Sequence, residues 1–412
     1  HYERAVALAP NNALAHNNLG IVLRSKGKLE EAIRHFEEAL RIDPKLANAR
    51  YKLSVALEQR NLDEAVRHYE EALRLDPKNA AAHVNLGDAL SKQRKRDQAI
   101  SHFEQALRLD PKNAAAHNSL GMALGAKGKP DEAIRHYEEA LCLDPKNANA
   151  HVNLGNALRT RGKPEEVIRH YEEALRLDPK LAQTHYGLGQ VLLSLGRLAE
   201  AQGALRRGHA LVPERDPLHG LITRQLQRCE RLLALEARLP AVLAGKEKPA
   251  DAAEWLELAG LCQTTKRYAT AARFYADAFA ADPKLADRRF PDHRYNAARY
   301  AVLAAAGQGA DGPKPDDKER ALLRRQALNW LRAHLALRQK QAESAKAADR
   351  TAAQRSLRSW QKEANLASVR EQQALATLPA EERAEWEKLW SDVAALLRRL
   401  DAGKPGAAPA GK

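Results

Sequence analysis

Apolar and small residues recur every three to four positions in the first half of the chain, and polar or charged residues fill many of the positions between them. The first clear example has Leu19 and Leu23 in one stripe and Phe36 in a second stripe. Because an α-helix turns once in about 3.6 residues, each stripe lies along one face of a helix. The pattern therefore predicts two amphipathic helices, at residues 14–25 and 30–42.

Glycine and proline mark the ends of these two helices. Gly27 lies in the Lys-Gly-Lys turn between them, where glycine readily takes the left-handed conformation that ends a helix. Pro44 follows the second helix and disfavours helical backbone in the residue before it. Small residues such as Gly20 and Ala32 allow the two helices to approach closely. Residues 13–46 are therefore predicted to form one helical hairpin.

The hairpin pattern returns with a nearly constant period along the chain. The prolines that close successive hairpins lie 33 or 34 residues apart, at Pro10, Pro44, Pro77, Pro111, Pro145, Pro179 and Pro213. Such a period is typical of solenoids, in which each repeat packs on its neighbours and the array presents a surface rather than a catalytic cleft. We predict six complete units, at residues 13–46, 47–79, 80–113, 114–147, 148–181 and 182–215.

The residues at fixed positions of each unit resemble those of the tetratricopeptide repeat (TPR) family. In the third unit these residues are Leu86, Gly87, Leu90, Ala99, Phe103, Ala106 and Pro111. The sixth unit departs from the pattern, with Leu205 in place of the second-helix aromatic residue and Gly208 in place of alanine. The resemblance implies an all-α fold, a right-handed TPR superhelix (α-solenoid), and a role in protein binding.

The strict period ends after Pro213, and the remaining chain is predicted to be helical but divergent. We expect helices at 218–238, 293–306, 317–341, 345–362 and 379–400, with Trp386 and Trp390 packing the last of them onto the array. The predicted organisation is a partial TPR (second helix) at 1–12, six units at 13–215, a linker helix and loop at 216–250, a degenerate TPR at 252–285, a divergent hairpin at 286–341, C-terminal helices at 342–400 and a disordered tail at 401–412.

Segments within residues 216–400 resemble the C-terminal region of planctomycete-type serine/threonine protein kinases that carry TPRs. The segments include Lys-Arg-Tyr at 266–268 and His-Arg-Tyr-Asn-Ala-Ala at 293–298. No glycine-rich phosphate loop, His-Arg-Asp loop or Asp-Phe-Gly motif occurs in the sequence. The chain begins within a repeat, so we expect it to be a non-enzymatic piece of a larger, bacterial signalling protein.

Composition adds a basic balance and few cysteines to this picture. The net charge is +14, and charges of both signs alternate along the predicted helix faces. Cys142, Cys229 and Cys262 are isolated in the sequence and suggest neither a disulfide framework nor a zinc site. No apolar run is long enough to span a bilayer. We therefore expect a cytoplasmic location, no cofactor and no membrane segment.

The candidate binding residues lie on the first helices, at positions that face the concave groove in the TPR family. Asparagine there offers both a donor and an acceptor to the backbone of an extended peptide. Such ladders occur in the repeats of O-linked N-acetylglucosamine transferases, which this segment resembles at Asn-Leu-Gly. We expect alanine in the ladder to weaken partner binding without lowering thermal stability. The predicted partner-binding residues are Asn17, Asn18, Asn48, Lys52, Asn85, Asp88, Ser119, Asn149, Asn153, Asn156 and Gln190.

Two other patterns suggest different chemistry. Histidines form two columns, but equivalent residues of adjacent repeats lie on the order of 10 Å apart, too far for shared metal ligation. We assign them a packing or surface role. The basic run at 92–96 raises a nucleic-acid-associated scaffold as an alternative, although neighbouring aromatic residues for base stacking are absent. A glycosyltransferase that recruits substrates through these repeats is the other alternative.

Overall fold

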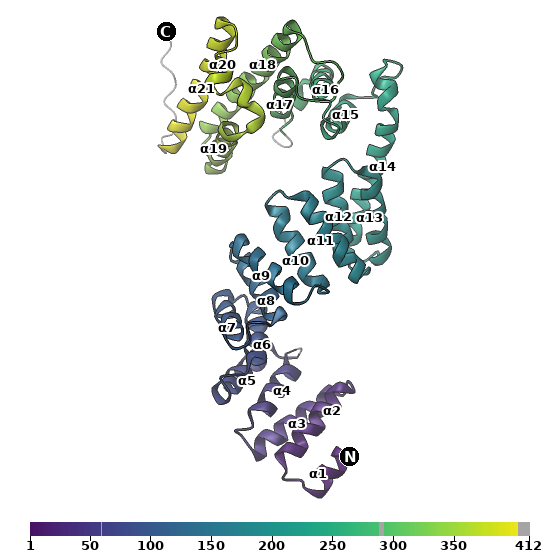
Figure 1. Ribbon diagram of the computed structural model, residues 1–412, viewed down its shortest axis with the longest axis vertical. Coiled ribbons are helices and arrows are strands. Elements are labelled where there is room, and N and C mark those ends of the chain that lie inside the picture. The colour runs from purple at the N-terminus through teal and green to yellow at the C-terminus, as the bar shows by residue number, and fades with distance from the viewer. Residues whose placement is uncertain (59, 288–291, 403–412) are drawn as a thin grey trace. The chain divides into compact units, whose positions relative to one another are not determined.

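The computed structural model describes residues 1–58, 60–287 and 292–402, and every regular element in this part of the chain is a helix (Figure 1). The all-α class predicted from the sequence is therefore confirmed, and the helices follow one another in a solenoid arrangement of hairpins. The last helix ends at Asp401. Most of the predicted tail, residues 403–412, lies outside the described residues.

The predicted hairpins of the first half are present, with boundaries close to those expected from the sequence. The helices predicted at 14–25 and 30–42 are α2 (Ala13–Ser25) and α3 (Leu29–Ile42), preceded by α1 (Tyr2–Leu8). The further hairpin helices are α4 (Ala47–Leu57), α5 (Leu62–Leu75), α6 (Ala80–Lys92), α7 (Arg96–Leu109), α8 (Ala114–Ala126), α9 (Pro130–Leu143), α10 (Ala148–Thr160), α11 (Pro164–Leu177), α12 (Ala182–Ser194) and α13 (Leu198–Leu211).

The Asp-Pro-Lys steps and the asparagines near them explain why each first helix begins where it does. The Asp76 carboxylate accepts a hydrogen bond from the Lys78 backbone N–H at 3.2 Å, which closes a tight turn after α5. Asn79 then caps α6 by accepting from the Ala82 backbone N–H at 3.0 Å. The same capping bond forms at Asn12, Asn113 and Asn147.

Glycine in the first helix allows each hairpin to close on an aromatic ring of the second helix. A Cβ atom added at Gly87 would lie 2.5 Å from a ring carbon of Phe103, which is closer than real Cβ contacts. Phe103 and Ala99 are fully buried at this crossing. The glycine of the Leu-Gly step is therefore required for helix approach, and the aromatic ring fills the remaining space.

The hairpins pack in two layers. The second helices α3, α5, α7 and α9 each contact their own first helix and the first helix of the next repeat, as in the contacts of α5 with α4 and with α6. Successive first helices also contact one another directly, as α6 does with α8 and α8 with α10. The first helices therefore form one continuous layer, and side chains from neighbouring repeats meet along it.

Contacts divide the chain into two compact units. The first comprises His1–Val191 and Gly203–Ile222, and the second comprises Leu192–Gln202 and Thr223–Lys412. The division falls within three helices, α12, α13 and α14 (Pro217–Leu243). The later helices are α15 (Ala252–Thr264), α16 (Tyr268–Ala281), η1 (Pro283–Asp287), α17 (His293–Ala305), α18 (Asp317–Ala342), α19 (Ala347–Lys362), η2 (Ala364–Val369), α20 (Gln372–Leu375) and α21 (Ala380–Asp401).

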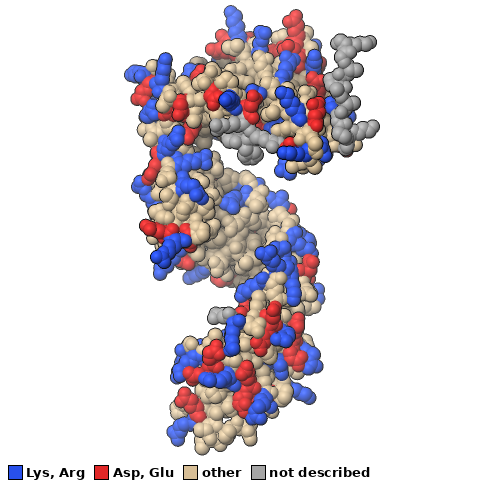
Figure 2. All heavy atoms as spheres, turned by 180° about the vertical axis from the view of Figure 1, so that it is seen from behind, with Lys and Arg blue, Asp and Glu red and all other residues tan. Residues whose placement is uncertain are grey.

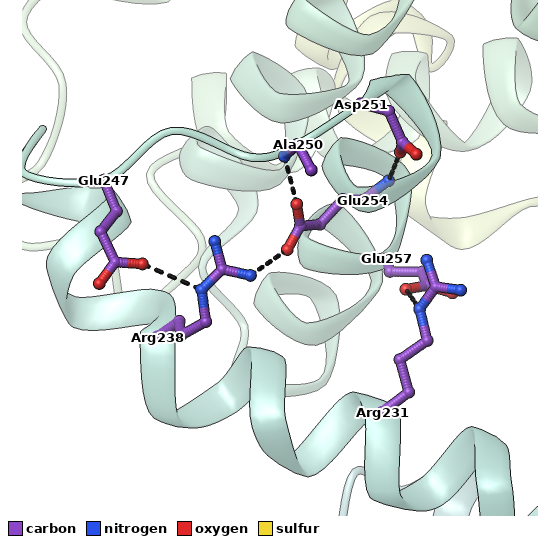
Figure 3. A network of polar contacts seen from close by, with 7 residues as sticks. All are labelled: Arg231, Arg238, Glu247, Ala250, Asp251, Glu254 and Glu257. Atoms are coloured by element: carbon purple, nitrogen blue, oxygen red, sulfur yellow. Dashed lines mark hydrogen bonds and ion pairs between the residues drawn. The ribbon is translucent and has the colours of Figure 1, made fainter.

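A polar network fixes the loop between α14 and α15 (Figure 3). Glu254 is buried, and its carboxylate accepts hydrogen bonds from the Arg238 guanidinium and from the Ala250 backbone N–H. Asp251 caps α15 through the Glu254 backbone N–H at 2.8 Å, and Arg238 also pairs with Glu247 at 2.9 Å. These contacts hold the Lys/Pro-rich loop against both helices and give the network a structural role.

The aromatic residues of the second unit lie mainly in its core. Trp360 and Trp386 are fully buried, and the Trp390 indole N–H donates to the Val369 carbonyl at 2.6 Å. Helix α21 contacts α18 and α19. The tryptophans of the last helix therefore pack it onto neighbouring helices, as its amphipathic sequence predicted.

The structure differs from the sequence prediction most clearly at α14. We predicted a helix at 218–238, but α14 continues through Pro240 to Leu243. Proline removes one backbone donor from the helix without forcing it to end when the following residues can still bond, and the Ala244 N–H does bond to the Pro240 carbonyl at 3.0 Å. The short helices η1, η2 and α20 were not predicted, because such segments are too brief to show a periodic pattern.

Candidate functional site

The candidate binding surface is the layer of first helices in the first unit. The residue before the Leu-Gly step, or before Leu53-Ser54 in the second repeat, is half-buried there in five repeats: Asn18, Lys52, Asn85, Ser119 and Asn153. They lie on α2, α4, α6, α8 and α10. We refer to these residues, together with Tyr51, Asp88, Asn118, Met122, Asn156, Tyr186 and Gln190, as the first-helix face.

Side chains of the first-helix face are hydrogen-bonded from one repeat to the next. The Asn85 amide donates to the Tyr51 hydroxyl at 3.0 Å, and the Asn153 amide donates to the Asn118 carbonyl oxygen at 3.0 Å. Each amide has two N–H groups and one acceptor oxygen, so one such bond leaves it with further hydrogen-bonding capacity. Asn85 and Asn153 are therefore held in position by the neighbouring repeat and keep capacity to bond to a ligand.

The ends of the first helices α4 and α6 carry paired charges. Lys92 forms an ion pair with Glu58 of the preceding repeat at 2.6 Å, and the Tyr69 hydroxyl donates to the same carboxylate at 3.1 Å. Burial raises the pKa of Asp88, and a hydrogen bond with Ser119 of the next repeat opposes that increase. The acidic groups of this region are thus bound within the array.

The last repeats of the first unit contribute uncharged polar groups. The Tyr171 hydroxyl donates to the Asn156 carbonyl oxygen at 2.6 Å. Gln190 donates to the Tyr186 hydroxyl at 2.8 Å and accepts from Arg159 at 3.4 Å. In Figure 2 a hollowed, mostly uncharged stretch occupies the middle of the view, whereas lysine, arginine, aspartate and glutamate alternate elsewhere.

Three of the predicted residues lie apart from this row. Asn17 is buried, 5% exposed, and its amide donates to the Asn18 oxygen at 3.5 Å. Asn48 and Asn149 are exposed in the first turns of α4 and α10. The structure thus brings together the residues at the centres of the first helices, but it places Asn17 in the interior and the other two near helix starts.

Sequence reasoning missed three polar members of the first-helix face. They are Tyr51, Asn118 and Tyr186, and each lies one residue before the position that Asn85 and Asn153 occupy in their repeats. The first two accept hydrogen bonds from Asn85 and Asn153, and the third accepts from Gln190, one helical turn further on. The repeat alignment contained this signal, since all three occupy the same position of their units. The exposed Met122, 52% accessible, lies on the same face of α8.

The basic run at 92–96 is a turn tied to the preceding repeat. Lys92 bonds to Glu58, and the Gln93 amide donates to Asp63 at 2.7 Å. Arg94 has a φ of 62°, which is the left-handed conformation that glycine supplies in other units. Lys92 and Gln93 thus hold the turn against the preceding repeat, and Arg94, Lys95 and Arg96 are exposed.

The histidine columns meet inside single hairpins. The Nδ1 atoms of His83 and His102 are 3.0 Å apart, and the same pairing recurs in three other units. Considering distances between repeats alone therefore missed a contact that forms within each repeat. No group of three or more potential metal-binding side chains occurs in the described part of the chain.

Other features of the described residues concern membranes and thiols. None of the described helices combines the length and apolar character that a bilayer crossing requires. Cys229 and Cys262 are buried and Cys142 is exposed, all as free thiols. Burial raises the pKa of the Cys262 thiol to about 12, so this group is a thiol rather than a reactive thiolate at neutral pH.

Family models match much of the first unit. Models described as tetratricopeptide repeat match residues 12–78, 54–112 and 84–148, and a model described as TPR repeat matches residues 155–196. A curated relative, the TPR repeat-containing thioredoxin TTL4 of Arabidopsis thaliana, is 40% identical over 53 residues. That match covers 13% of this chain, and the chain spans 8% of the length of the relative.

Solved structures show similar arrangements over part of the chain. MamA is 27% identical and covers 40% of this chain and 96% of its own, with a TM-score of 0.36. YrrB, described as a TPR protein with an unusual peptide-binding site, is 24% identical over 44% of this chain and 95% of its own, with a TM-score of 0.39. The repeats between residues 12 and 196 are tetratricopeptide repeats, which support a role as a protein–protein interaction scaffold.

Proposed function

We propose that the repeat array binds an extended segment of a partner protein along the first-helix face. The observation that carries this proposal is the set of hydrogen bonds between repeats, Asn85 to Tyr51 and Asn153 to Asn118. These bonds fix amide groups in place before a ligand arrives, which reduces the entropy lost on binding. Amides with remaining donors and acceptors can then pair with the N–H and C=O groups of a peptide backbone.

The spacing of the repeats suits an extended ligand. An extended chain rises about 3.3 Å per residue, and packed helices lie about 8–10 Å apart. Roughly every third residue of a bound peptide would therefore meet a new first helix. Backbone contacts of this kind supply affinity for many sequences, while the cationic Lys52 and the apolar, exposed Met122 supply different contacts for ligand side chains.

The test is calorimetric titration with a peptide selected against the full chain from a random library. The double variant Asn85→Ala, Asn153→Ala removes two of the ordered amides. We expect its Kd to increase about tenfold or more, equivalent to about 1.4 kcal/mol. The control is Gln98→Ala with Gln105→Ala, two exposed amides on α7 that lie outside the first-helix face. Equal losses in the two variants, or no loss in the first, would contradict the proposal.

The structure revises one expectation for this variant. The sequence suggested that alanine would leave thermal stability unchanged, but Asn85 and Asn153 each donate a part-buried hydrogen bond between repeats. Loss of such a bond costs about 1 kcal/mol. We therefore expect a modest drop in the unfolding temperature as well, and the titrations belong well below that temperature.

We further propose that this array is the recruiting part of a bacterial serine/threonine kinase. The support is the resemblance of segments within residues 216–400 to the C-terminal region of such kinases. A glycosyltransferase with the same repeats is the alternative. Sequencing the complete reading frame decides between them, because a kinase carries a glycine-rich loop, a His-Arg-Asp loop and an Asp-Phe-Gly motif.

A further inference from the structure

Four hairpins of the first unit contain the same pair of histidines, one on each helix. The first member lies in the first turn of the first helix, and the second member lies 19 residues later on the second helix. Their Nδ1 atoms are 3.0 or 3.1 Å apart. The pairs are His16 with His35, His83 with His102, His117 with His136, and His151 with His170.

Each pair is also bonded to the end of the preceding hairpin. The Nε2 atom of His117 lies 3.2 Å from the carbonyl oxygen of Pro111, and the other first members make the same contact at 3.0 to 3.3 Å. Pro111 closes the hairpin before the one that contains His117. One imidazole therefore links three segments, namely the preceding turn, the first helix and the second helix.

Hydrogen-bond chemistry assigns the protons in this chain of contacts, which runs from the proline carbonyl to the first ring and on to the second ring; we call it the relay. A carbonyl oxygen only accepts, so the first histidine must carry its proton on Nε2. In the neutral ring Nδ1 is then an acceptor, and the second histidine must donate from its own Nδ1. The relay tolerates one extra proton, on Nε2 of the second ring. A further proton on the first ring places two N–H donors face to face and abolishes the bond between the rings.

Two other repeats of the first unit break the relay in different ways. In the second repeat, residues 47–79, Arg50 replaces the first histidine and donates to the Pro44 carbonyl at 3.0 Å, while His68 remains on the second helix. In the sixth repeat His185 keeps its contact with the Pro179 carbonyl at 3.1 Å, but Ala204 replaces the second histidine. The chain thus contains a permanently cationic version of this junction and an unpaired version.

We propose that the four histidine pairs form an acid-sensitive joint between successive repeats, in which double protonation of a pair breaks the contact between the two helices of a hairpin. The relevant range lies below about pH 6.5, where free histidine becomes protonated. Since the same relay is repeated, protonation weakens several hairpins of the array together. The predicted consequence is a first unit that loosens reversibly in mild acid.

The surroundings of the pairs favour the neutral form. Burial, followed by the charge of the first ring, lowers the pKa of His102, His136 and His170 below the ordinary value. Burial and then His16 act in the same way on His35. The charged groups that face these second members are Arg34, Glu31 and Glu38 at His35; Arg135, Glu132 and Glu104 at His136; and Arg169 and Glu166 at His170.

The direction of the effect follows from these lowered pKa values. Below about pH 6.5 the unfolded chain binds protons that the folded pairs do not accept. The contribution of the pairs to the free energy of unfolding is therefore fully present above that pH. It is lost as the pH falls toward the lowered pKa values of the folded state. Each pair contributes about one proton taken up on unfolding, because a folded pair accepts one proton and an unfolded pair accepts two.

The experiment is thermal unfolding of the full chain between about pH 5.5 and 7.5, a range in which histidines titrate and most carboxylates remain ionised. The variant replaces the four second members by asparagine: His35→Asn, His102→Asn, His136→Asn and His170→Asn. The asparagine amide donates its N–H to a neutral first ring and, turned over, accepts from the Nδ1–H of a protonated first ring, so the folded variant no longer excludes a proton. We expect the unfolding midpoint of the native chain to fall steeply as the pH is lowered. The decrease in the variant is expected to be less than half as large.

The second repeat supplies an independent test, in which a substitution is expected to increase the pH dependence of the unfolding midpoint. The single variant Arg50→His completes a fifth pair with His68 and is expected to steepen the pH dependence. The control His185→Asn changes an unpaired histidine and is expected to leave the slope close to native. If the unfolding midpoints of the native chain and the fourfold variant fall equally as the pH is lowered, the proposal is contradicted. If the fourfold variant does not fold, an unchanged slope in Arg50→His contradicts it instead.

Discussion

At the scale of single residues, the closeness of the two helices depends on the absence of a side chain at one position. The Gly87 backbone lies against the Phe103 ring, and an added Cβ would approach three ring carbons at 2.5, 2.8 and 2.9 Å. Gly203 on α13 lies in open space, with no atom within 4 Å of an added Cβ. These two glycines have the same chemistry but opposite surroundings.

We therefore predict opposite effects of alanine at these two sites. Gly87→Ala forces Phe103 or the helix to move and is expected to lower the free energy of unfolding by about 1–3 kcal/mol. Gly203→Ala is expected to raise it by about 0.5–1 kcal/mol, because alanine favours helix without a clash. Urea unfolding of both variants measures the difference. A stabilised Gly87→Ala variant would show that the Phe103 ring does not require glycine at this position.

At the scale of secondary-structure elements, α14 contains prolines in two different settings. Pro217 begins the helix, where the N–H that proline lacks has no partner within the helix. Pro240 lies inside the same helix, where its missing N–H leaves the carbonyl of Glu236 without a helical donor. Proline is thus compatible with the first position of the helix, at Pro217, and lowers helix stability at the interior position, Pro240.

The prediction for α14 compares alanine at both prolines. Pro240→Ala restores a helical hydrogen bond and is expected to raise the free energy of unfolding of the second unit by about 1–3 kcal/mol. Pro217 belongs to the first unit, and Pro217→Ala is expected to change the free energy of unfolding of that unit by less than about 0.5 kcal/mol. Thermal unfolding followed by circular dichroism provides the measurement. Equal effects at both sites would indicate that Pro240 is accommodated by an irregularity in the helix.

The elements themselves were largely readable from the sequence, and the contacts between them were not. Apolar periodicity, capping asparagines and the Asp-Pro-Lys turns place α2 and α3 within one residue of their predicted bounds. The pairing of His83 with His102 depends on how two helices face each other, which a linear pattern does not contain. The continuation of α14 past Pro240 likewise depends on hydrogen bonds formed after the proline.

At the scale of the whole molecule, the chain comprises a repeat unit and a divergent helical unit, each with its own core. The regular unit carries the first-helix face, and the second unit packs its tryptophans in or against its core, with Trp360 and Trp386 fully buried. A solenoid distributes binding over several repeats, each with a modest contribution. The roles of Asn85, Asp88, Asn153 and Gln190 in that binding are proposals that follow from the residues' positions on this face.

Photo-crosslinking from one side of the repeat array tests the binding proposal most directly. A photoreactive amino acid replaces either Met122 on the first-helix face or Leu109 at the end of α7, both of which are exposed. Each variant is irradiated with the selected peptide, and the products are identified by mass spectrometry. We predict a crosslink from position 122 that excess unlabelled peptide abolishes, and little or none from position 109. Crosslinking from position 109 alone would contradict binding along the first-helix face.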